Sequence, residues 1–177
     1  PEPWTLYKGK HLLSFVDNHD VTRIASILNN EKHLPLIYAL CFSMPGIPCV
    51  YYGSEWGFKA RKEEGDPALR PCFDKPEWNE LSDWISKLAH AVTSTKALSY
   101  GMFDSIVLTN QQCAFLRTCD DERILVSINA DENPFYMNFD MGVSSATDLL
   151  SGDTIELNNG FEAKGYSAYY KGILSMF

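Results

Sequence analysis

The sequence lacks the features that mark several large classes of protein. Lys and Arg number 15 in 177 residues against 23 Asp and Glu, so the formal net charge is −8. No cluster of basic side chains is present to neutralise phosphates, and nucleic acid is therefore not expected as a partner. No apolar run approaches the ~20 residues that a membrane-spanning helix needs, and we expect no membrane partner. A neutral polyol fits this charge balance better.

The cysteines indicate neither a disulfide framework nor a zinc site. They are odd in number and show no Cys-x-x-Cys spacing: Cys41, Cys49, Cys72, Cys113 and Cys119. No calcium-ligand cluster of carboxylates and carbonyls can be read either, and we expect no metal and no cofactor. From this cysteine usage we expect a cytoplasmic protein with reduced, mostly buried thiols, and a secreted protein is the alternative.

The chain is organised around residues 12–20. An apolar run ends abruptly in Asp17-Asn18-His19-Asp20, and a helical pattern follows. Strand, polar cluster and helix form the βα unit of an α/β protein, in which catalytic groups collect just past the carboxyl end of a buried strand. A purely structural interpretation of these residues is equally open at this point. Asp20 could be the N-cap of the following helix, with Asn18 and His19 as ordinary turn residues.

A second βα unit follows the first. Apolar residues at three- and four-residue spacing predict helices over residues 21–28 and 31–44. Cys49 to Tyr52 then indicate a second buried strand, closed by Gly53-Ser54-Glu55. Two such units make a β-α-β arrangement with a right-handed crossover. Residues 56–78 are rich in Gly, Pro and charge, and a loop of this length in a compact domain is usually functional.

The period of the apolar residues changes after the next helix. The pattern predicts a helix over residues 79–98 with Asn79 as its cap, and an alternation with a period of two beyond Gly101. Turns rich in Gly, Asn and Asp separate short strand candidates, which is typical of an antiparallel sandwich. The candidates cover residues 103–109, 113–118, 124–130, 135–139, 147–150, 154–157 and 165–170. We therefore predict two domains, residues 1–100 and residues 101–177.

Three motifs stand in order within about sixty residues, which makes a strong signal. They are Phe15-Val16-Asp17-Asn18-His19-Asp20, the segment from Gly46-Ile47-Pro48 to Tyr51-Tyr52-Gly53-Ser54-Glu55, and Asp66-Pro67-Ala68-Leu69-Arg70. They resemble the seventh-strand motif, the eighth-strand segment and the following loop of the α-amylase family, glycoside hydrolase family 13. The resemblance implies an α/β plus all-β chain: an incomplete TIM (β/α)8 barrel remnant followed by an antiparallel β-sandwich, with the earlier barrel strands missing.

Two carboxylates close the predicted strands, Asp20 and Glu55. Retaining glycosidases need two carboxyl groups about 5–5.5 Å apart, one as nucleophile and one as acid/base, and from this chain alone these two would be the natural pair. The resemblance instead places the nucleophile and the acid/base on the fourth and fifth strands, which are absent here. It makes Asp20 a catalytic transition-state stabiliser, and we interpret Glu55 as a structural carboxylate that bonds backbone or Arg groups. Tyr51 and Tyr52 we interpret as core aromatics.

Four further residues are candidates for substrate binding, three of them by the same resemblance. His19 matches a residue that hydrogen-bonds the sugar held by Asp20. Asp66 and Arg70 are candidates for gripping a glucose unit, with a loop salt bridge as the alternative. Arg23 could help to hold the catalytic carboxylates ionised, or could pair with a surface acid.

The resemblance implies an enzyme. The chain would be part of a retaining α-glucan-active glycoside hydrolase of the α-amylase, cyclomaltodextrinase or α-glucosidase type, acting on α-1,4-linked glucose polymers or oligosaccharides. The isolated chain is expected to be inactive, because the nucleophile and the acid/base lie outside it. The alternatives are a transglycosylase of the same family, and a non-catalytic relative or carbohydrate-binding module. Exposed barrel strands also predict self-association.

Overall fold

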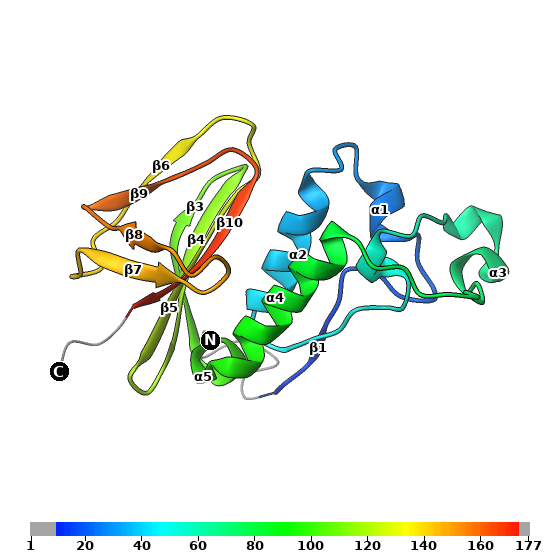
Figure 1. Ribbon diagram of the computed structural model, residues 1–177, viewed down its shortest axis with the longest axis horizontal. Coiled ribbons are helices and arrows are strands. Elements are labelled where there is room, and N and C mark those ends of the chain that lie inside the picture. Colours follow the sequence, from blue (N-terminus) through cyan, green and yellow to red (C-terminus); the bar gives the residue numbers. More distant parts are fainter. Residues whose placement is uncertain (1–9, 174–177) are drawn as a thin grey trace.

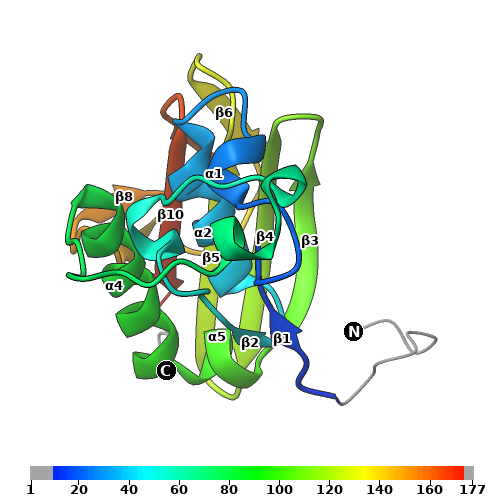
Figure 2. The ribbon, with the colours of Figure 1, turned by 90° about the vertical axis from the view of Figure 1, so that its right-hand side faces the viewer.

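The computed structural model describes residues 10–173, and its elements form layers. A six-stranded sheet stands on one side, the helices α2 (His33–Ser43) and α4 (Glu80–Ser94) lie against it, and the short helix α3 (Asp66–Leu69) lies at the far side of these helices (Figure 1). Turning the molecule shows the helices in front of the strands of the sheet (Figure 2). Within the described residues no helix is long and apolar enough to cross a membrane.

The first two strands form a short parallel pair. β1 (Leu13–Ser14) pairs with β2 (Ile47–Pro48), and Cys49 N–H extends the ladder by donating to Ser14 O at 2.8 Å. Gly46 precedes β2 with φ +135°, and a Cβ atom there would lie 2.5 Å from Ser14 Oγ. The close approach of the two strands therefore requires glycine.

The predicted second strand was wrong in its position. It was expected over residues 49–52, whereas β2 ends at Pro48. The chain turns instead, because Ser54 N–H donates to Tyr51 O at 3.0 Å and Gly53 adopts φ +87°. The loop expected over residues 56–78 contains the 3₁₀ turn Lys62–Glu64 and α3, and another 3₁₀ turn, Ser54–Trp56, ends at its first residue.

The helices follow the predicted apolar pattern. α1 (Ile24–Ile27) is a single turn, and α4 buries Ile85, Leu88 and Val92 along one face. Asn79 Oδ1 accepts from Ser82 N–H at 3.1 Å, which confirms Asn79 as the cap. The helix expected over residues 79–98 is divided into α4 and α5 (Lys96–Tyr100). Thr95 interrupts it with ψ 134°, and its hydroxyl donates to Ala91 O at 2.8 Å.

The carboxy-terminal half is antiparallel throughout the described residues. The six-stranded sheet has the order β3-β4-β5-β10-β7-β8, and β6 pairs with β9 in a second sheet of two strands. The bounds are β3 (Met102–Leu108), β4 (Gln112–Cys119), β5 (Glu122–Asn129), β6 (Phe135–Asn138), β7 (Ser145–Asp148), β8 (Thr154–Glu156), β9 (Gly160–Ala163) and β10 (Ser167–Ile173). β9 was not predicted, because its four residues begin with a glycine directly after an Asn-Asn turn.

Both faces of the six-stranded sheet are buried, against different layers. One face packs Phe115, Val126 and Tyr170 on apolar side chains of α2 and α4. A hydrogen bond from Arg117 Nη1 to Ser43 O, 2.6 Å long, fastens the carboxyl end of α2 to this face. The opposite face packs on the two-stranded sheet around Leu125 and Met137. The helices and the sheet therefore share one apolar core.

Several apolar side chains around β1 and β2 are exposed, which leaves self-association a prediction: Leu12, Leu13, Phe15 and Ile47. The cysteines also depart from expectation. All five are free, but only Cys41 is buried, whereas Cys49 and Cys72 are exposed. The prediction of mostly buried thiols was wrong, because Cys49 directly follows the short β2 and Cys72 lies in the long loop.

A lysine is completely buried between the two sheets. Lys171 Nζ donates to Ser127 Oγ at 2.8 Å and lies 3.7 Å from the ring centre of Phe161 and 4.7 Å from that of Tyr169. Burial lowers the pKa of Lys171 to about 7, although the negative charge of Asp148 acts in the opposite direction. The hydroxyl and the two ring faces together replace the water that the ammonium group loses.

Lys171→Met should change how stability depends on pH. The pKa of this lysine is about 7 in the folded protein against an ordinary value of 10.5, so the unfolded chain binds more protons between these pH values. The contribution of Lys171 to the free energy of unfolding therefore rises with pH across that window. Urea denaturation at about pH 7 and about pH 9 should show a smaller rise in Lys171→Met than in the parent protein. Lys164→Met, at an exposed lysine, should keep the parent behaviour; equal profiles in all three proteins would contradict the prediction.

Candidate active site

The polar cluster after β1 divides into a buried part and an exposed part. Asp17 is only 2% exposed, and its Oδ2 accepts from Ile24 N–H at 2.9 Å. The helix-capping role that the purely structural interpretation gave to Asp20 therefore belongs to Asp17. Asn18 Oδ1 accepts from the N–H of Asp20 at 2.8 Å, so Asn18 orients the turn as expected.

Asp20 presents its carboxylate to the surface between two basic groups. Its side chain is 59% exposed, His19 Nε2 lies 3.1 Å from Oδ2, and Arg70 Nη2 donates to Oδ1 at 2.9 Å. Arg70 Nε also donates to the backbone oxygen of His19 at 3.3 Å. The side chains of His19 and Asp20, which were predicted to hold the same sugar, are therefore in contact, and Arg70, predicted to act with Asp66, contacts Asp20 as well.

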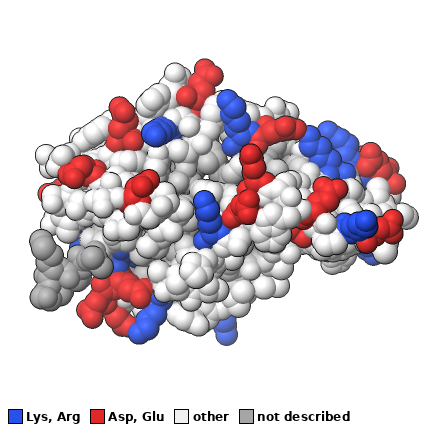
Figure 3. Space-filling model, viewed as in Figure 1, with Lys and Arg blue, Asp and Glu red and all other residues white. Residues whose placement is uncertain are grey.

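Asp66 joins this cluster through Arg70. Its Oδ2 lies 3.5 Å from Arg70 Nη2, and its Oδ1 accepts from Lys62 Nζ at 3.0 Å. The hydrogen bond from Lys62, followed by the charges of Arg70 and Lys62, holds the pKa of Asp66 below its ordinary value. Acidic and basic side chains are correspondingly interleaved at the end of the molecule that carries α3 (Figure 3). Asp66 and Arg70 contact each other as an ion pair, and Arg70 also contacts Asp20.

Arg23 occupies a different position from the one expected. Its side chain is 0% exposed, so the assignment as a substrate-contacting residue is wrong, and so is the alternative pairing with a surface acid. Its guanidinium donates to Tyr52 O at 2.9 Å, Ser54 Oγ at 2.8 Å and Leu69 O at 2.7 Å. The guanidinium carbon also lies 4.1 Å from the ring centre of Tyr51. From its buried position Arg23 therefore holds together the segments that contain Tyr52, Ser54 and Leu69.

Ser54 is a functional neighbour that the sequence interpretation missed. Its hydroxyl lies 2.9 Å from both carboxylate oxygens of Asp17 and accepts from Arg23, which links the two charged side chains. Tyr38 OH donates to Ser54 O at 3.2 Å, and burial, followed by the charge of Asp17, raises the pKa of Tyr38. Ser54 stands in the Tyr-Tyr-Gly-Ser-Glu segment, but nothing in that pattern distinguishes it from a turn residue.

The aromatic residues of the second motif and Glu55 only partly match expectation. Tyr51 is half-buried beneath Arg23, whereas Tyr52 is 42% exposed, so the interpretation of Tyr52 as a core residue was wrong. Tyr52, Trp56, Arg70 and Phe73 line a cavity of about 510 Å³ beside the cluster. The hydrogen bonds expected for Glu55 are not seen: its buried Oε2 has no partner within residues 10–173.

The cluster can bind and orient a polar ligand, because both of its carboxylates, Asp20 and Asp66, are more than half exposed. Asp20 is accessible, His19 and Arg70 fix its orientation, and the aromatic cavity adjoins Arg70. Residues 10–173 contain no group of three His, Cys, Asp or Glu side chains able to hold a metal ion. Such an arrangement suits electrostatic stabilisation of a developing positive charge.

The fold is shared with solved α-amylase structures. The crystal structure of an Anoxybacillus α-amylase superposes with a TM-score of 0.82 and 24% identity, over 94% of this chain and 39% of that one. The family profile described as "Alpha amylase, catalytic domain" matches residues 4–134, which is most of the chain. The chain belongs to the α-amylase family.

Two curated relatives agree with this membership. "Alpha-amylase 2" of Dictyoglomus thermophilum is 29% identical over 150 residues, which is 80% of this chain and 26% of that protein. The cyclomaltodextrin glucanotransferase of Bacillus sp. (strain 6.6.3) is 26% identical over 156 residues, which is 84% of this chain and 21% of that protein. The chain thus spans about a quarter or less of the length of these relatives.

Arg23→Met should destabilise the chain strongly. It removes the donor for Tyr52 O, Ser54 Oγ and Leu69 O at a position that is 0% exposed. Removing one member of a buried charged network lowers the free energy of unfolding by about 3–5 kcal/mol. Urea denaturation of the 177-residue chain measures the loss. The matched control is Arg61→Met, at an exposed arginine that donates to Ser26 O, and it should change stability by less than about 1 kcal/mol. Similar losses in both variants would contradict the internal role of Arg23.

Proposed function

We propose that this chain is the carboxy-terminal part of a retaining glycoside hydrolase that acts on α-1,4-linked glucose polymers or oligosaccharides. The observation that carries the proposal is the exposed carboxylate of Asp20, held between His19 and Arg70 just past a strand of a parallel pair. The carboxyl end of parallel strands is where catalytic groups of α/β barrels collect. Family membership supports the choice of glycoside hydrolysis.

In this proposal Asp20 stabilises the transition state. Glycosidic cleavage passes through an oxocarbenium-like state, and a carboxylate fixed beside the sugar ring favours that positive charge over the neutral ground state. His19 hydrogen-bonds the same sugar. Arg70 and Asp66 grip a neighbouring glucose unit beside the cavity lined by Tyr52 and Trp56, because their side chains are only partly occupied by each other.

Arg23 acts in this proposal as a positioning residue. Arg23 donates a hydrogen bond to Leu69 O, and the next residue, Arg70, donates to Asp20. The buried guanidinium of Arg23 therefore determines the position of the exposed guanidinium of Arg70. Through Leu69 and Arg70, Arg23 fixes the position of Asp20 relative to the strands. Arg23 itself does not contact the sugar. Correct placement of a charged group to within a fraction of an ångström is worth several kcal/mol in rate.

The proposal also assigns the architecture. Residues 1–100 are the last part of a TIM-barrel catalytic domain, and residues 101–177 are a β-sandwich domain formed by the six-stranded and two-stranded sheets. The nucleophile and the acid/base come from barrel strands outside this chain. The exposed apolar residues around β1 are the surface that those strands would cover, and in their absence they favour self-association.

A transglycosylase is the second candidate. The cyclomaltodextrin glucanotransferase among the relatives supports it. Hydrolysis and transfer differ in whether water or a sugar reaches the glycosyl-enzyme, and both use the same stabilising carboxylate. A non-catalytic relative or a free carbohydrate-binding module fits less well, because the chain retains both Asp20 and His19 in contact at 3.1 Å.

In a complete enzyme that contains this segment, Asp20→Asn should reduce kcat by several orders of magnitude, because it removes the charge that stabilises the transition state. Thermal unfolding should be nearly unchanged, since the side chain is 59% exposed. Release of reducing sugar from maltooligosaccharides measures the rate. His19→Ala should be milder and affect KM and kcat together, and Asp104→Asn, at an exposed carboxylate on β3, is the matched control. A normal rate in Asp20→Asn would remove Asp20 from the mechanism.

The 177-residue chain alone should release no reducing sugar from starch, maltooligosaccharides or cyclodextrins. One stabilising carboxylate without a nucleophile and an acid gives no route to a glycosyl-enzyme intermediate. Sustained product release by the purified chain, abolished by Asp20→Asn, would show that the chain carries a complete catalytic site and would overturn the proposed assignment of roles.

A further inference from the structure

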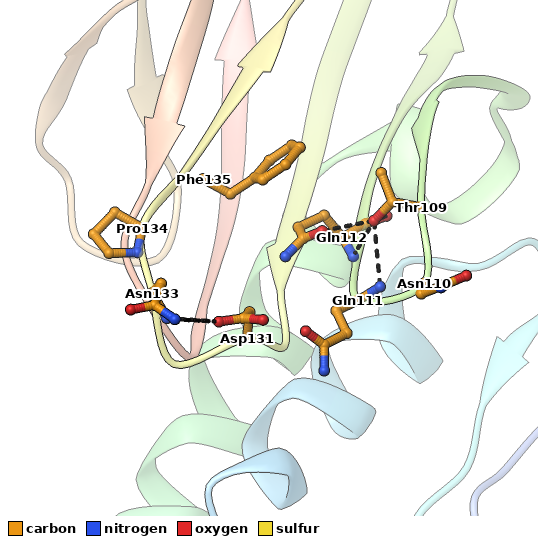
Figure 4. A pocket seen from close by; sticks show the side chains of 8 residues that line it. All are labelled: Thr109, Asn110, Gln111, Gln112, Asp131, Asn133, Pro134 and Phe135. Carbon is orange, nitrogen blue, oxygen red and sulfur yellow. Dashed lines mark hydrogen bonds between the residues drawn. The ribbon is translucent and has the colours of Figure 1, made fainter.

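A second cavity lies in the carboxy-terminal sheets, away from Asp20. It has a volume of about 570 Å³ and is formed by the turn between β3 and β4 and by the loop between β5 and β6 (Figure 4). Thr109, Gln111 and Gln112 line one side, and Asp131, Pro134 and Phe135 line the other. This volume falls within the ~300–1,000 Å³ typical of small-molecule sites. None of the residues around Asp20 contributes to it.

The first wall of the cavity is held in place by its own hydrogen bonds. Thr109 Oγ1 donates to Gln112 Oε1 at 2.6 Å, and Gln112 Nε2 donates to Oδ1 of the fully buried Asn129 at 3.0 Å. The backbone N–H of Ala130 donates to Gln111 O at 2.8 Å, which ties the two loops together.

The second wall is fixed in the same way. Asn133 donates to Asp131 Oδ1 from its backbone N–H at 2.8 Å and from Nδ2 at 3.0 Å, and Asn129 Nδ2 donates to Asn133 O at 2.8 Å. The cavity is therefore preformed, and a ligand would not need to order the loops before binding.

Three polar groups remain available to a ligand. Within residues 10–173 the side-chain amides of Asn110 and Gln111 make no hydrogen bond, and Asp131 Oδ2 is not used by the contacts that hold Oδ1. Amides both donate and accept, and the carboxylate accepts. Pro134 and the ring of Phe135, which extends from β6 toward the Gln112 side in Figure 4, add an apolar surface.

This combination selects the chemistry of the ligand. No Lys or Arg lines the cavity, so phosphates and other anions lack a partner, and one carboxylate is too few for a divalent cation. Hydroxyl groups that donate and accept in pairs, on a ring with an apolar face, match the free amides, the carboxylate and the Phe135 surface. These are the properties of a neutral pyranose.

We propose that this cavity binds a glucose unit of an α-glucan as a second carbohydrate site. The lining of the cavity suits a neutral pyranose, and the choice of an α-glucan rests on the proposed function. The helices α2 and α4 lie between the sheets and α3, so the site and the Asp20 cluster occupy separate parts of the molecule (Figure 1). A long glucan held at the second site would have a raised effective concentration at the first.

The test is a titration of the isotopically labelled 177-residue chain with maltoheptaose, followed through its backbone amide signals by NMR. The amides of Gln111, Gln112 and Phe135 should shift saturably with a Kd of about 1 mM, because few hydrogen bonds are made. The double variant Asn110→Ala with Gln111→Ala should weaken this binding about tenfold or more. Asn138→Ala, at an exposed asparagine on β6 outside the cavity, is the matched control and should leave the Kd unchanged.

The outcomes separate this inference from the proposed function. Absent shifts at these amides, or shifts that survive in the double variant, would overturn the inference even if the amides of His19 and Arg70 respond to the sugar. Equal shifts with cellopentaose, a β-linked glucan, would overturn the assignment to α-glucans. The two proposals can also fail separately. If the cavity amides shift saturably but the Asp20→Asn variant of the complete enzyme keeps a normal rate, the second site is supported and the role proposed for Asp20 is refuted.

Discussion

The structure of the amino-terminal half depends on one buried polar chain, from Arg23 through Ser54 to Asp17. These residues come from the turn after β1 and from the turn after β2, and each is no more than 2% exposed. A buried charge is tolerated only where hydrogen bonds replace its hydration. Arg23 therefore brings Tyr52 O and Leu69 O to itself, and the segments that carry them must adopt these positions.

This arrangement determines which side chains face outward. Because Asp17 is committed to Ser54 and to the first helix, the next residues leave the interior and Asp20 reaches the surface. Because Leu69 is held by Arg23, Arg70 projects from the same place and meets Asp20. The positions of the exposed side chains therefore depend on the buried hydrogen bonds of Arg23 and Asp17.

The sequence could predict the elements whose signals are local. The capped helix that begins after Asn79, the polar turn at Asn18 and most strands beyond Gly101 follow from periodicity and turn chemistry. The motif resemblance predicted the pairs His19 with Asp20 and Asp66 with Arg70, but not that Arg70 would join the two pairs. The burial of Arg23 was not, since an arginine in sequence looks the same whether its partners are water or backbone carbonyls. Strand β9 and the position of β2 were missed because two to four residues carry too weak a pattern.

The core shared by α2, α4 and the six-stranded sheet limits how evolution can recombine these parts. Tyr170 in β10 donates a hydrogen bond to Ala39 O, and Arg117 in β4 donates to Ser43 O, so two strands of the six-stranded sheet complete the hydrogen bonding of α2, which lies far earlier in the chain. A carboxy-terminal sheet taken from a relative would bring a foreign surface to these helices. Exchange of that segment between enzymes is therefore open only to donors that preserve both the apolar side chains and these two donors, and the helix and the sheet are expected to be inherited as one module.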